Sequence, residues 1–334
     1  MTVGACMLTV VDRSLIALPC GLARRSLRVV GLDPERLRYG RIPVESQYHA
    51  PISWGEAGNA VVSDILQSGQ SCLVARLGGV EARACTYWTR WRARRLLQLG
   101  WPRNLRVEIS RNAGFFPVNA PNLDRFARLY LDSLSEADVL AVWLITPDEH
   151  VLARTHCPDA RLVNGTALDS MIYADPWSAA LEGKRVLVIH PFAASIERQY
   201  RERRELLYRN PKVLPPFELT TIRAVQSIAG NPVGFPSWFD AFEHMCGQID
   251  RAEFDIAIIG AGAYGLPLGA HVKRSGRQAV HLGGVTQMLF GVVGRRWQVE
   301  YDERYSGLVN EAWVRPSPDE TPAGHAAVEG GCYW

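Results

Sequence analysis

The fold is decided by the stretch Phe254-Asp-Ile-Ala-Ile-Ile-Gly-Ala-Gly-Ala-Tyr-Gly265. Its first half is a run of strand-forming residues, and its second half is a GxGxxG pattern that opens a helix predicted from about 264 to 274. Backbone N–H groups at such a helix start can hold a pyrophosphate, although the glycines can also serve only to pack the helix closely on the strand. The segment therefore predicts a strand, a glycine turn and a helix of an α/β protein.

The same order of elements recurs along the chain. Short apolar runs predict strands over 71–76, 137–145, 184–189 and 278–281, and helices are expected over 56–67, 80–98 and 194–208. This alternation is typical of a parallel sheet whose strands are buried on both faces. We expect a Rossmann-like, doubly wound α/β domain over 51–300, with a mostly parallel sheet and helices on both faces. An N-terminal arm or extension would occupy 1–50, and 301–334 would form a C-terminal extended strap or a flexible tail.

The composition excludes several classes of protein. The 334 residues are 47% hydrophobic and 21% charged, which suits one large core or two modest ones and not a disordered chain. With 37 Lys and Arg against 34 Asp and Glu, the net charge of +3 is too small for a nucleic-acid-binding protein. The seven cysteines are scattered without CxxC spacing, which indicates free or buried thiols in a reducing compartment. Without a signal peptide or a long apolar run, we expect a bacterial-type cytoplasmic protein with at most peripheral membrane contact.

A dinucleotide site would need an acidic residue about 20 positions beyond the glycine pattern, at the end of the next strand. That place holds His281-Leu-Gly-Gly284, and no Asp or Glu is nearby. The sequence therefore disfavours NAD and leaves a nucleotide or a diphosphate as the expected ligand.

Two other predicted strands also end in residues that carry chemistry. The first runs into Arg76-Leu-Gly-Gly-Val-Glu81, where Glu81 could complement the helix dipole or meet a ribose, a sugar hydroxyl or a metal-bound water. His190 follows the strand at 184–189, where it could hydrogen-bond a phosphate, act as a general base or simply pack. Because open α/β sheets bind ligands at the carboxyl ends of their strands, we expect these groups to line one site.

An ordered set of motifs over about 55–334 resembles bacterial proteins classed with the GT-D fold glycosyltransferases. The set comprises Arg76-x-Gly78-x-x-Glu81, His190-Pro-Phe followed by Ser195-Ile-x-x-Gln199-Tyr200, the stretch 254–265, His281-Leu-Gly-Gly284-x-x-Gln287-x-x-Phe290-Gly291, Trp313-x-x-Pro316 and Tyr333-Trp334. The resemblance implies a sheet that binds a nucleotide-sugar donor and transfers the sugar to a hydroxyl acceptor. The acceptor would be a glycan, a lipid-linked or a small molecule in bacterial surface polysaccharide or natural-product biosynthesis.

The expected site follows from the motifs and the resemblance together. Its catalytic base would be Glu81, His190 or Glu197, in that order of preference. Its nucleotide-sugar-binding residues would be Arg76, Gly78, Gly79, Ser195, Gln199, Gly260, Gly262, Tyr264, Gly265, His281, Gly283, Gly284 and Gln287. A non-catalytic nucleotide- or sugar-phosphate-binding regulatory module, or a sugar-phosphate or pyruvyl-type transferase, would use the same scaffold.

A divalent cation is a separate expectation, and it rests on the resemblance. The characterised branch of the family carries an Asp-x-Glu pair in the first glycine turn, linked to a divalent cation and the donor diphosphate. This chain matches at Glu81 but has Gly79 at the aspartate position. Mn²⁺ or Mg²⁺ at Glu81 would therefore need another carboxylate from elsewhere in the fold, and Arg76 or His190 could instead neutralise the leaving diphosphate.

Overall fold

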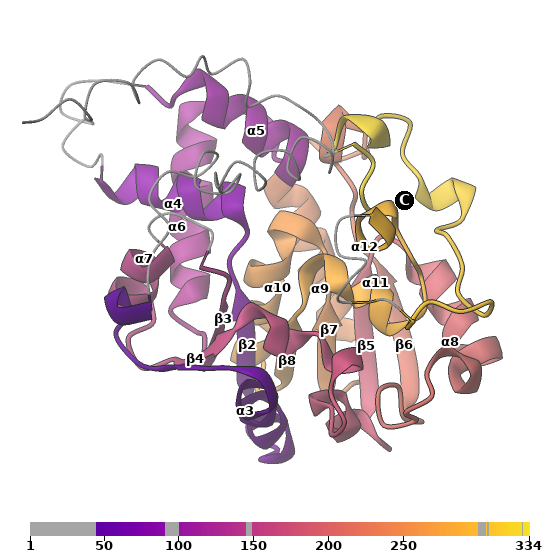
Figure 1. Cartoon of the computed structure of the whole chain (residues 1–334). Helices are drawn as coiled ribbons and strands as arrows, with labels where there is room; N and C mark the ends of the chain where they lie inside the picture. The colour runs from indigo at the N-terminus through magenta and orange to yellow at the C-terminus, as the bar shows by residue number, and fades with distance from the viewer. Residues whose placement is uncertain (1–44, 91–99, 145–148, 300–304, 306, 329) are drawn as a thin grey trace, which may run out of the picture.

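The computed structural model describes residues 45–90, 100–144, 149–299, 305, 307–328 and 330–334. Its centre is an eight-stranded sheet in the order β1-β4-β3-β2-β8-β7-β5-β6 (Figure 1). Every pair of neighbouring strands is parallel. The strands are β1 (Ile52–Ser53), β2 (Cys72–Arg76), β3 (Val139–Val142), β4 (Arg161–Asn164), β5 (Arg185–His190), β6 (Glu218–Arg223), β7 (Ile256–Ile259) and β8 (Gln278–His281).

Helices cover both faces of the sheet. One face carries α4 (Gly79–Arg90), α5 (Arg103–Ala113), α6 (Ala120–Leu134), α7 (Glu149–His156), α9 (Trp238–Arg251) and α10 (Gly265–Arg274). The other carries α3 (Gly55–Gln67), α8 (Ala193–Leu207), α11 (Thr286–Leu289) and α12 (Arg295–Val299). The doubly wound α/β fold expected from the sequence is confirmed, and the sheet is parallel throughout its described strands.

The strand residues explain the two layers. On β5, Leu187 and Ile189 enter the core beneath α9 and α10, whereas Val186 and Val188 enter the core beneath α8. All four side chains are fully buried. Because successive side chains of a strand point to opposite faces, a continuous apolar run feeds both cores at once. This is the physical basis of the runs that predicted the strands.

The crossovers define where a ligand can bind. The chain leaves β5 through α8 on one face, and it leaves the neighbouring strand β7 through α10 on the other face. The same divergence separates β2, which runs into α4, from its neighbour β8, which runs into α11. Loops that part in this way open a crevice at the carboxyl edge of an α/β sheet. The strands β2, β8, β7 and β5 are consecutive in the sheet, so both divergences lie along one edge.

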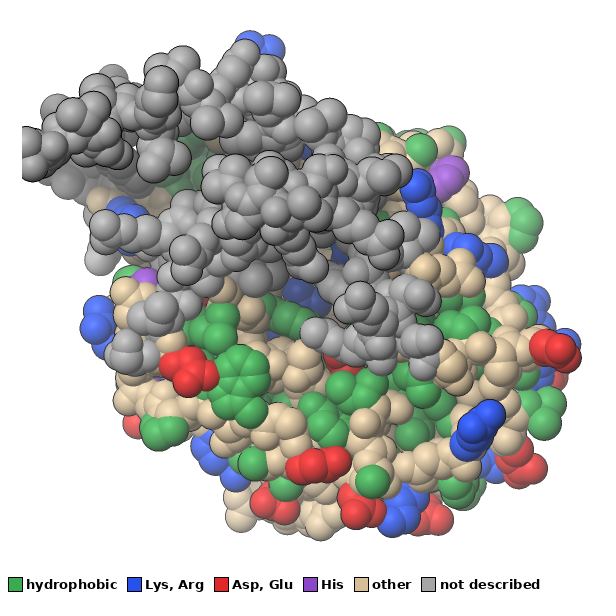
Figure 2. All heavy atoms as spheres, in the orientation of Figure 1, with side chains coloured by type: hydrophobic (Ala, Val, Ile, Leu, Met, Phe, Trp, Pro, Cys, Tyr) green, Lys and Arg blue, Asp and Glu red, His purple; other side chains and the backbone are tan. Residues whose placement is uncertain are grey.

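Some expectations end at the limits of the described chain. The helix predicted over 80–98 is described as far as Arg90, and the N-terminal arm at 1–50 lies almost wholly outside the described residues. None of the described helices combines the length and apolar character needed to cross a membrane. The five described cysteines, Cys72, Cys85, Cys157, Cys246 and Cys332, are all buried. In the face shown by Figure 2, acidic and basic side chains are interspersed over the lower half.

Candidate functional site

The carboxyl ends of β2, β8, β7 and β5 meet in a group of segments that we call the rim: 76–81, 190, 260–265 and 281–284. The close contacts between these segments can be seen from the atoms that a Cβ atom added to each glycine would meet. A Cβ atom on Gly260 would lie 2.5 Å from His190 Cδ2 and 2.8 Å from the carbonyl oxygen of Gly283. One on Gly283 would overlap the Arg76 guanidinium, and one on Gly265 would overlap the His281 ring. The rim therefore joins four strand ends into one surface, and it brings together most of the residues expected from the sequence.

The turn after β7 is open to a ligand. Gly262 has a φ of 54°, in the left-handed region, and a Cβ atom there would meet nothing within 4 Å. This glycine is exposed, whereas Tyr264 two residues later is buried and stacks on Trp238 at 4.5 Å between ring centroids. The Tyr264 hydroxyl also lies 3.2 Å from Ser227 Oγ. The tyrosine anchors the turn from within the core, so the glycine side of the turn is the part left for a ligand.

Arg76 is the cation of the rim. Its guanidinium lies over the Trp143 ring, with Cζ 5.3 Å from the ring centroid, and it packs against Gly283. Its Nε is buried and has no hydrogen-bond partner among the described residues. The same is true of His281 Nδ1 and of Trp143 Nε1, at the ends of β8 and β3, the strands on either side of β2. Buried polar atoms without partners are rare in proteins and mark places where a ligand or water completes the bonding.

Glu81 lies at the start of α4, and its carboxyl group packs against Gly78. Burial raises the pKa of Glu81, while the main-chain N–H groups of Val80 and Glu81 and the charges of Arg76 and Arg83 act in the opposite direction. The carboxyl therefore caps the helix that follows β2 and faces the charge of Arg76. A buried carboxyl with a raised pKa is suited to hold a proton in a reaction near neutral pH.

Glu149 is a second buried acid of this region, and the sequence did not point to it. Its Oε2 accepts hydrogen bonds from the Tyr48 hydroxyl at 2.8 Å and from the N–H groups of Trp143 and Leu144, each at 3.2 Å. Leu144 has a φ of 56°, and two successive amides turned in this way form a small anion-binding nest. Burial raises the pKa of Glu149 to about 7, against these hydrogen bonds and the charge of Arg76. The only signal in the sequence was an acidic residue after the predicted strand at 137–145.

We predict a specific pH dependence of stability from Glu149. Its folded pKa of about 7 exceeds the ordinary value of 4.5, so between these values the folded protein binds more protons than the unfolded chain. The resulting stabilisation is present below pH 4.5 and is lost as pH rises through 7. Glu149→Gln removes this dependence. When the pH is raised from 4.5 to 8, the free energy of unfolding of the variant should therefore rise by about 3 kcal/mol relative to that of the wild type. Urea denaturation at both pH values measures the gain, and a difference that does not change with pH would contradict it.

Both rim histidines are neutral near pH 7. Burial lowers the pKa of His190 to about 3, and burial together with the charge of Arg76 lowers the pKa of His281 to about 3. The Nδ1 of His190 accepts a hydrogen bond from the N–H of Phe192 at 3.0 Å, which places its proton on Nε2. A neutral imidazole of this kind donates a hydrogen bond to a phosphate or hydroxyl oxygen. This favours a donor role for His190 over the role of general base.

Three side chains expected to bind the nucleotide sugar instead hold the C-terminal segment. The hydroxyl and N–H of Ser195 donate to the buried carboxylate of Glu320. The amide of Gln199 donates to the carbonyl oxygen of Ala312 at 2.8 Å, and the amide of Gln287 to that of Tyr333 at 3.1 Å. We therefore leave these three residues out of the proposed site. Gly284, whose added Cβ atom would lie 2.5 Å from the Tyr333 ring, also packs against this segment.

Glu197 lies away from the rim. Its carboxylate pairs with Arg201 at 2.6 Å, one turn further along α8, and accepts a hydrogen bond from the Thr221 hydroxyl at 3.3 Å. Thr221 is two residues before the end of β6, on its half-buried outer surface. We therefore do not propose Glu197 as the catalytic base, and we choose the base from the residues of the rim.

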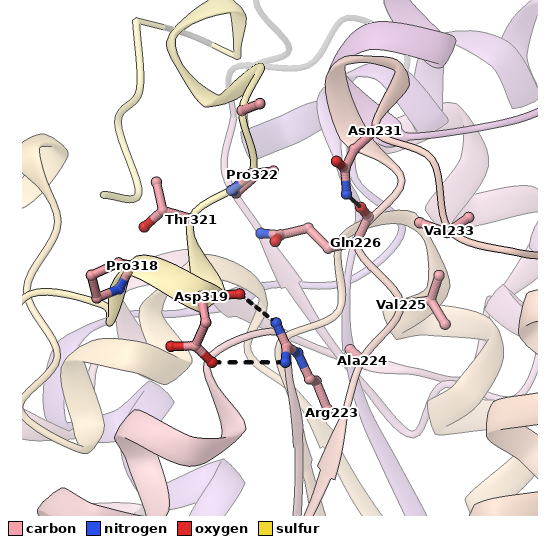
Figure 3. Close-up of a pocket in the computed structure, with 11 residues that line it drawn as sticks. Arg223, Ala224, Val225, Gln226, Asn231, Val233, Pro318, Asp319, Thr321 and Pro322 are labelled. Carbon is pink, nitrogen blue, oxygen red and sulfur yellow. Dashed lines mark hydrogen bonds and ion pairs between the residues drawn. The ribbon is translucent and has the colours of Figure 1, made fainter.

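A pocket of about 550 Å³ adjoins the rim beyond β5 (Figure 3). One wall is the loop after β6, and the other is part of the C-terminal segment. The lining residues are Arg223, Ala224, Val225, Gln226, Asn231, Val233, Pro318, Asp319, Thr321, Pro322 and Ala323. The N–H of Ala224 donates to the carbonyl oxygen of His190 at 3.1 Å, which ties this wall to the rim. No local motif in the sequence marks these residues as a binding site.

The residues described here do not fit a divalent cation. Within the described ranges, no three His, Cys, Asp or Glu side chains gather in a group that could hold a metal ion. The carboxyl group of Glu81 is engaged with the start of its own helix. We therefore derive no step through Mn²⁺ or Mg²⁺.

The substitution Gly260→Ala tests the close approach that joins β7 to the rest of the rim. Its Cβ atom would meet His190, the Thr286 hydroxyl at 2.6 Å and the Gly283 main chain, so we expect a loss of about 1–3 kcal/mol in the free energy of unfolding. The control is Gly247→Ala in α9, where an added Cβ atom has only a 3.5 Å contact with the end of the Arg251 side chain. That helical substitution should stabilise by about 0.5–1 kcal/mol. Urea denaturation of both variants gives the comparison, and equal effects would contradict the packing described.

Comparison with known proteins adds a likeness of fold. No family model and no curated protein matches the chain. A selenomethionine-substituted structure of domain of unknown function 1792 is similar to it, with a TM-score of 0.42 and 13% sequence identity. A second structure, described as this domain with a distinct glycosyltransferase fold, has a TM-score of 0.41 and 12% identity. Each comparison covers 80% of this chain and 92% of the other. Neither similarity carries a conclusion about the function of this chain.

Proposed function

We propose that this protein is a glycosyltransferase that binds a nucleotide-sugar donor on the rim and transfers the sugar to a hydroxyl acceptor. The observation that carries the proposal is the set of buried polar atoms of Arg76, His281 and Trp143 that have no hydrogen-bond partner among the described residues; these atoms lie at the ends of β2 and of its two neighbours in the sheet. The main-chain amides of the glycine turn and the half-buried Arg76 guanidinium are suited to a diphosphate, because both present N–H donors to its oxygens.

The chemistry can be assigned to these groups. The acceptor oxygen attacks the anomeric carbon of the sugar, the bond from that carbon to the diphosphate oxygen breaks, and the nucleoside diphosphate leaves with the bonding electron pair. Arg76 and the amides of Ala261 and Gly262 stabilise the charge that develops on the leaving group. Glu81 takes the proton of the acceptor hydroxyl, and the neutral His190 donates a hydrogen bond to an oxygen of the donor.

We place this reaction in bacterial surface glycan or natural-product biosynthesis, in the cytoplasm, where nucleotide sugars would supply the donor. The proposal follows from the motif resemblance together with the diphosphate character of the rim.

Calorimetric titration with UDP, GDP, CMP and dTDP sugars, with and without Mn²⁺, tests the proposal. We expect one of the donors that carry a diphosphate, a UDP, GDP or dTDP sugar, to bind to the wild type. Glu81→Gln should bind the same donor with similar affinity and release its nucleotide much more slowly when a cell-extract acceptor pool is added. Failure of every donor to bind would overturn the proposal, and equal release by Glu81→Gln would remove Glu81 from the catalytic role.

A further inference from the structure

We infer that the pocket between the loop after β6 and the C-terminal segment is the acceptor subsite, and that it takes a neutral, hydroxyl-rich ligand such as a sugar ring. The inference rests on the proposed transfer at the rim and adds the class and place of the second substrate. The pocket has a volume of about 550 Å³, which lies within the range of about 300–1,000 Å³ that is typical of small-molecule sites.

The polar groups of the pocket suit hydroxyls. The side-chain amide of Gln226 points into the pocket in Figure 3, and it makes no hydrogen bond to another described residue. Asn231 donates to the main-chain oxygen of Gln226 at 2.9 Å, and the Thr321 hydroxyl donates to the carbonyl oxygen of Ser317 at 3.2 Å. A side-chain amide offers both donors and an acceptor, as a sugar hydroxyl does, so the two can pair in either direction.

The charges of the pocket favour a neutral ligand over a phosphate. Among the described residues, its lining contains one cation, Arg223, and one carboxylate, Asp319. Arg223 donates to the main-chain oxygen of Asp319 at 2.6 Å, and its other terminal nitrogen lies 3.9 Å from the carboxylate (Figure 3). The cation is thus already balanced, and a bound phosphate would face the negative charge of Asp319. The pocket therefore suits a neutral ligand, whereas the rim, where Arg76 lies beside glycine turns, suits a phosphate.

The position of the pocket suits an acceptor. Arg223 is paired with His190 across β6 and β5, so the pocket begins where the rim ends. Ser227, one residue after Gln226, hydrogen-bonds through its hydroxyl to the carbonyl oxygen of Gly114 and lies beside the Tyr264 hydroxyl of the glycine turn. A ligand in the pocket is therefore a neighbour of a donor bound at 260–262, as transfer between two substrates requires.

The second wall of the pocket is held rigidly in place. Glu320, between the lining residues Asp319 and Thr321, is buried and accepts hydrogen bonds from Ser195 at the start of α8. Its main-chain oxygen accepts a hydrogen bond from the indole of Trp334 at 3.2 Å. Further along, a Cβ atom on Gly324 would lie 3.0 Å from Cβ of Ala229, so this segment packs closely on the opposite loop. A preformed wall lowers the cost of ordering when a ligand binds.

The test is the binding of methyl glycosides of glucose, galactose, mannose and N-acetylglucosamine, measured by saturation-transfer NMR. The protein is saturated with the nucleoside diphosphate that binds best in calorimetry, or left free if none binds. We expect at least one glycoside to bind to the wild type and Gln226→Ala to weaken it by about tenfold. Gln67→Ala, at the exposed end of α3, is the matched control and should bind like the wild type. Inorganic phosphate should not displace the glycoside.

Several results would overturn the inference: no glycoside binds, Gln226→Ala binds as well as the wild type while both variants melt normally, or phosphate displaces the glycoside. Calorimetry of the same samples separates this inference from the proposed function. Nucleotide binding without glycoside binding refutes the acceptor subsite alone. Glycoside binding that depends on Gln226 without any nucleotide binding supports the sugar site and refutes the donor site.

Discussion

Replacing Arg76 with methionine should lower kcat/KM for sugar transfer by about 10²–10³-fold, because the rim then loses the guanidinium that stabilises the leaving diphosphate. Methionine keeps much of the apolar stem that packs against Trp143 and Gly283, so the fold should persist. Nucleotide release in the presence of the acceptor measures the rate, and calorimetry measures the affinity for the donor.

Two further variants sharpen this expectation. Arg76→Lys keeps the charge but loses the planar fork of donors, so its loss should be intermediate. Arg161→Met removes an exposed arginine at the opposite edge of the sheet, at the first residue of β4, and should leave transfer unchanged. If Arg76→Met transferred sugar as fast as Arg161→Met, the proposed place of the diphosphate would be wrong.

Replacing Glu320 with alanine should lower the free energy of unfolding by about 3 kcal/mol, because several donors that the carboxylate satisfies would lose their acceptor. These donors are the N–H and hydroxyl groups of Ser195 and Ser317. The side chain is 1% exposed, so water cannot replace the lost acceptor without opening the packing. Urea denaturation measures the change.

The control for this substitution is another glutamate of the same layer. Glu205, on α8, pairs with Arg204 at 2.8 Å, but its side chain is 81% exposed. Glu205→Ala should therefore change stability by no more than about 0.5 kcal/mol. A Glu320→Ala variant that is equally undisturbed would show that the C-terminal segment is not anchored as described, and the pocket wall built on it would lose its support.

Most of the fold could be predicted because the signal for its elements lies in residues that are close together in the sequence. The strand over 278–281 is found with the predicted bounds, and the helix predicted over 56–67 begins one residue earlier, at Gly55. These elements can be predicted from neighbouring residues alone, because an apolar run beside a glycine turn indicates a strand that contributes to both cores. The short strands β1 and β4 and the edge strand β6 escaped notice. The sequence of β6, Glu-Leu-Thr-Thr-Ile-Arg, alternates in burial, and its edge position removes the continuous apolar run.

That the candidate site residues lie together could be predicted from the sequence only where it depends on strand ends. Arg76, Gly260 and His281 come together because the sheet order places their strands side by side. Ser195 and Gln199 looked equally suited to a ligand, but their partners Glu320 and Ala312 lie more than a hundred residues away. Glu149 was missed for the same reason, since its partner Tyr48 is distant in the chain. No local pattern reports such pairings, which arise only from tertiary contacts.

A crystal structure of the protein soaked with the nucleoside diphosphate that binds best tests the central proposal most directly. We predict that the diphosphate lies within hydrogen-bonding distance of the amides of Ala261 and Gly262 and of the Arg76 guanidinium, with the pocket beyond β5 still free for the acceptor. A diphosphate bound elsewhere, or bound beside Arg223 and Asp319, would contradict the proposed division between donor and acceptor sites.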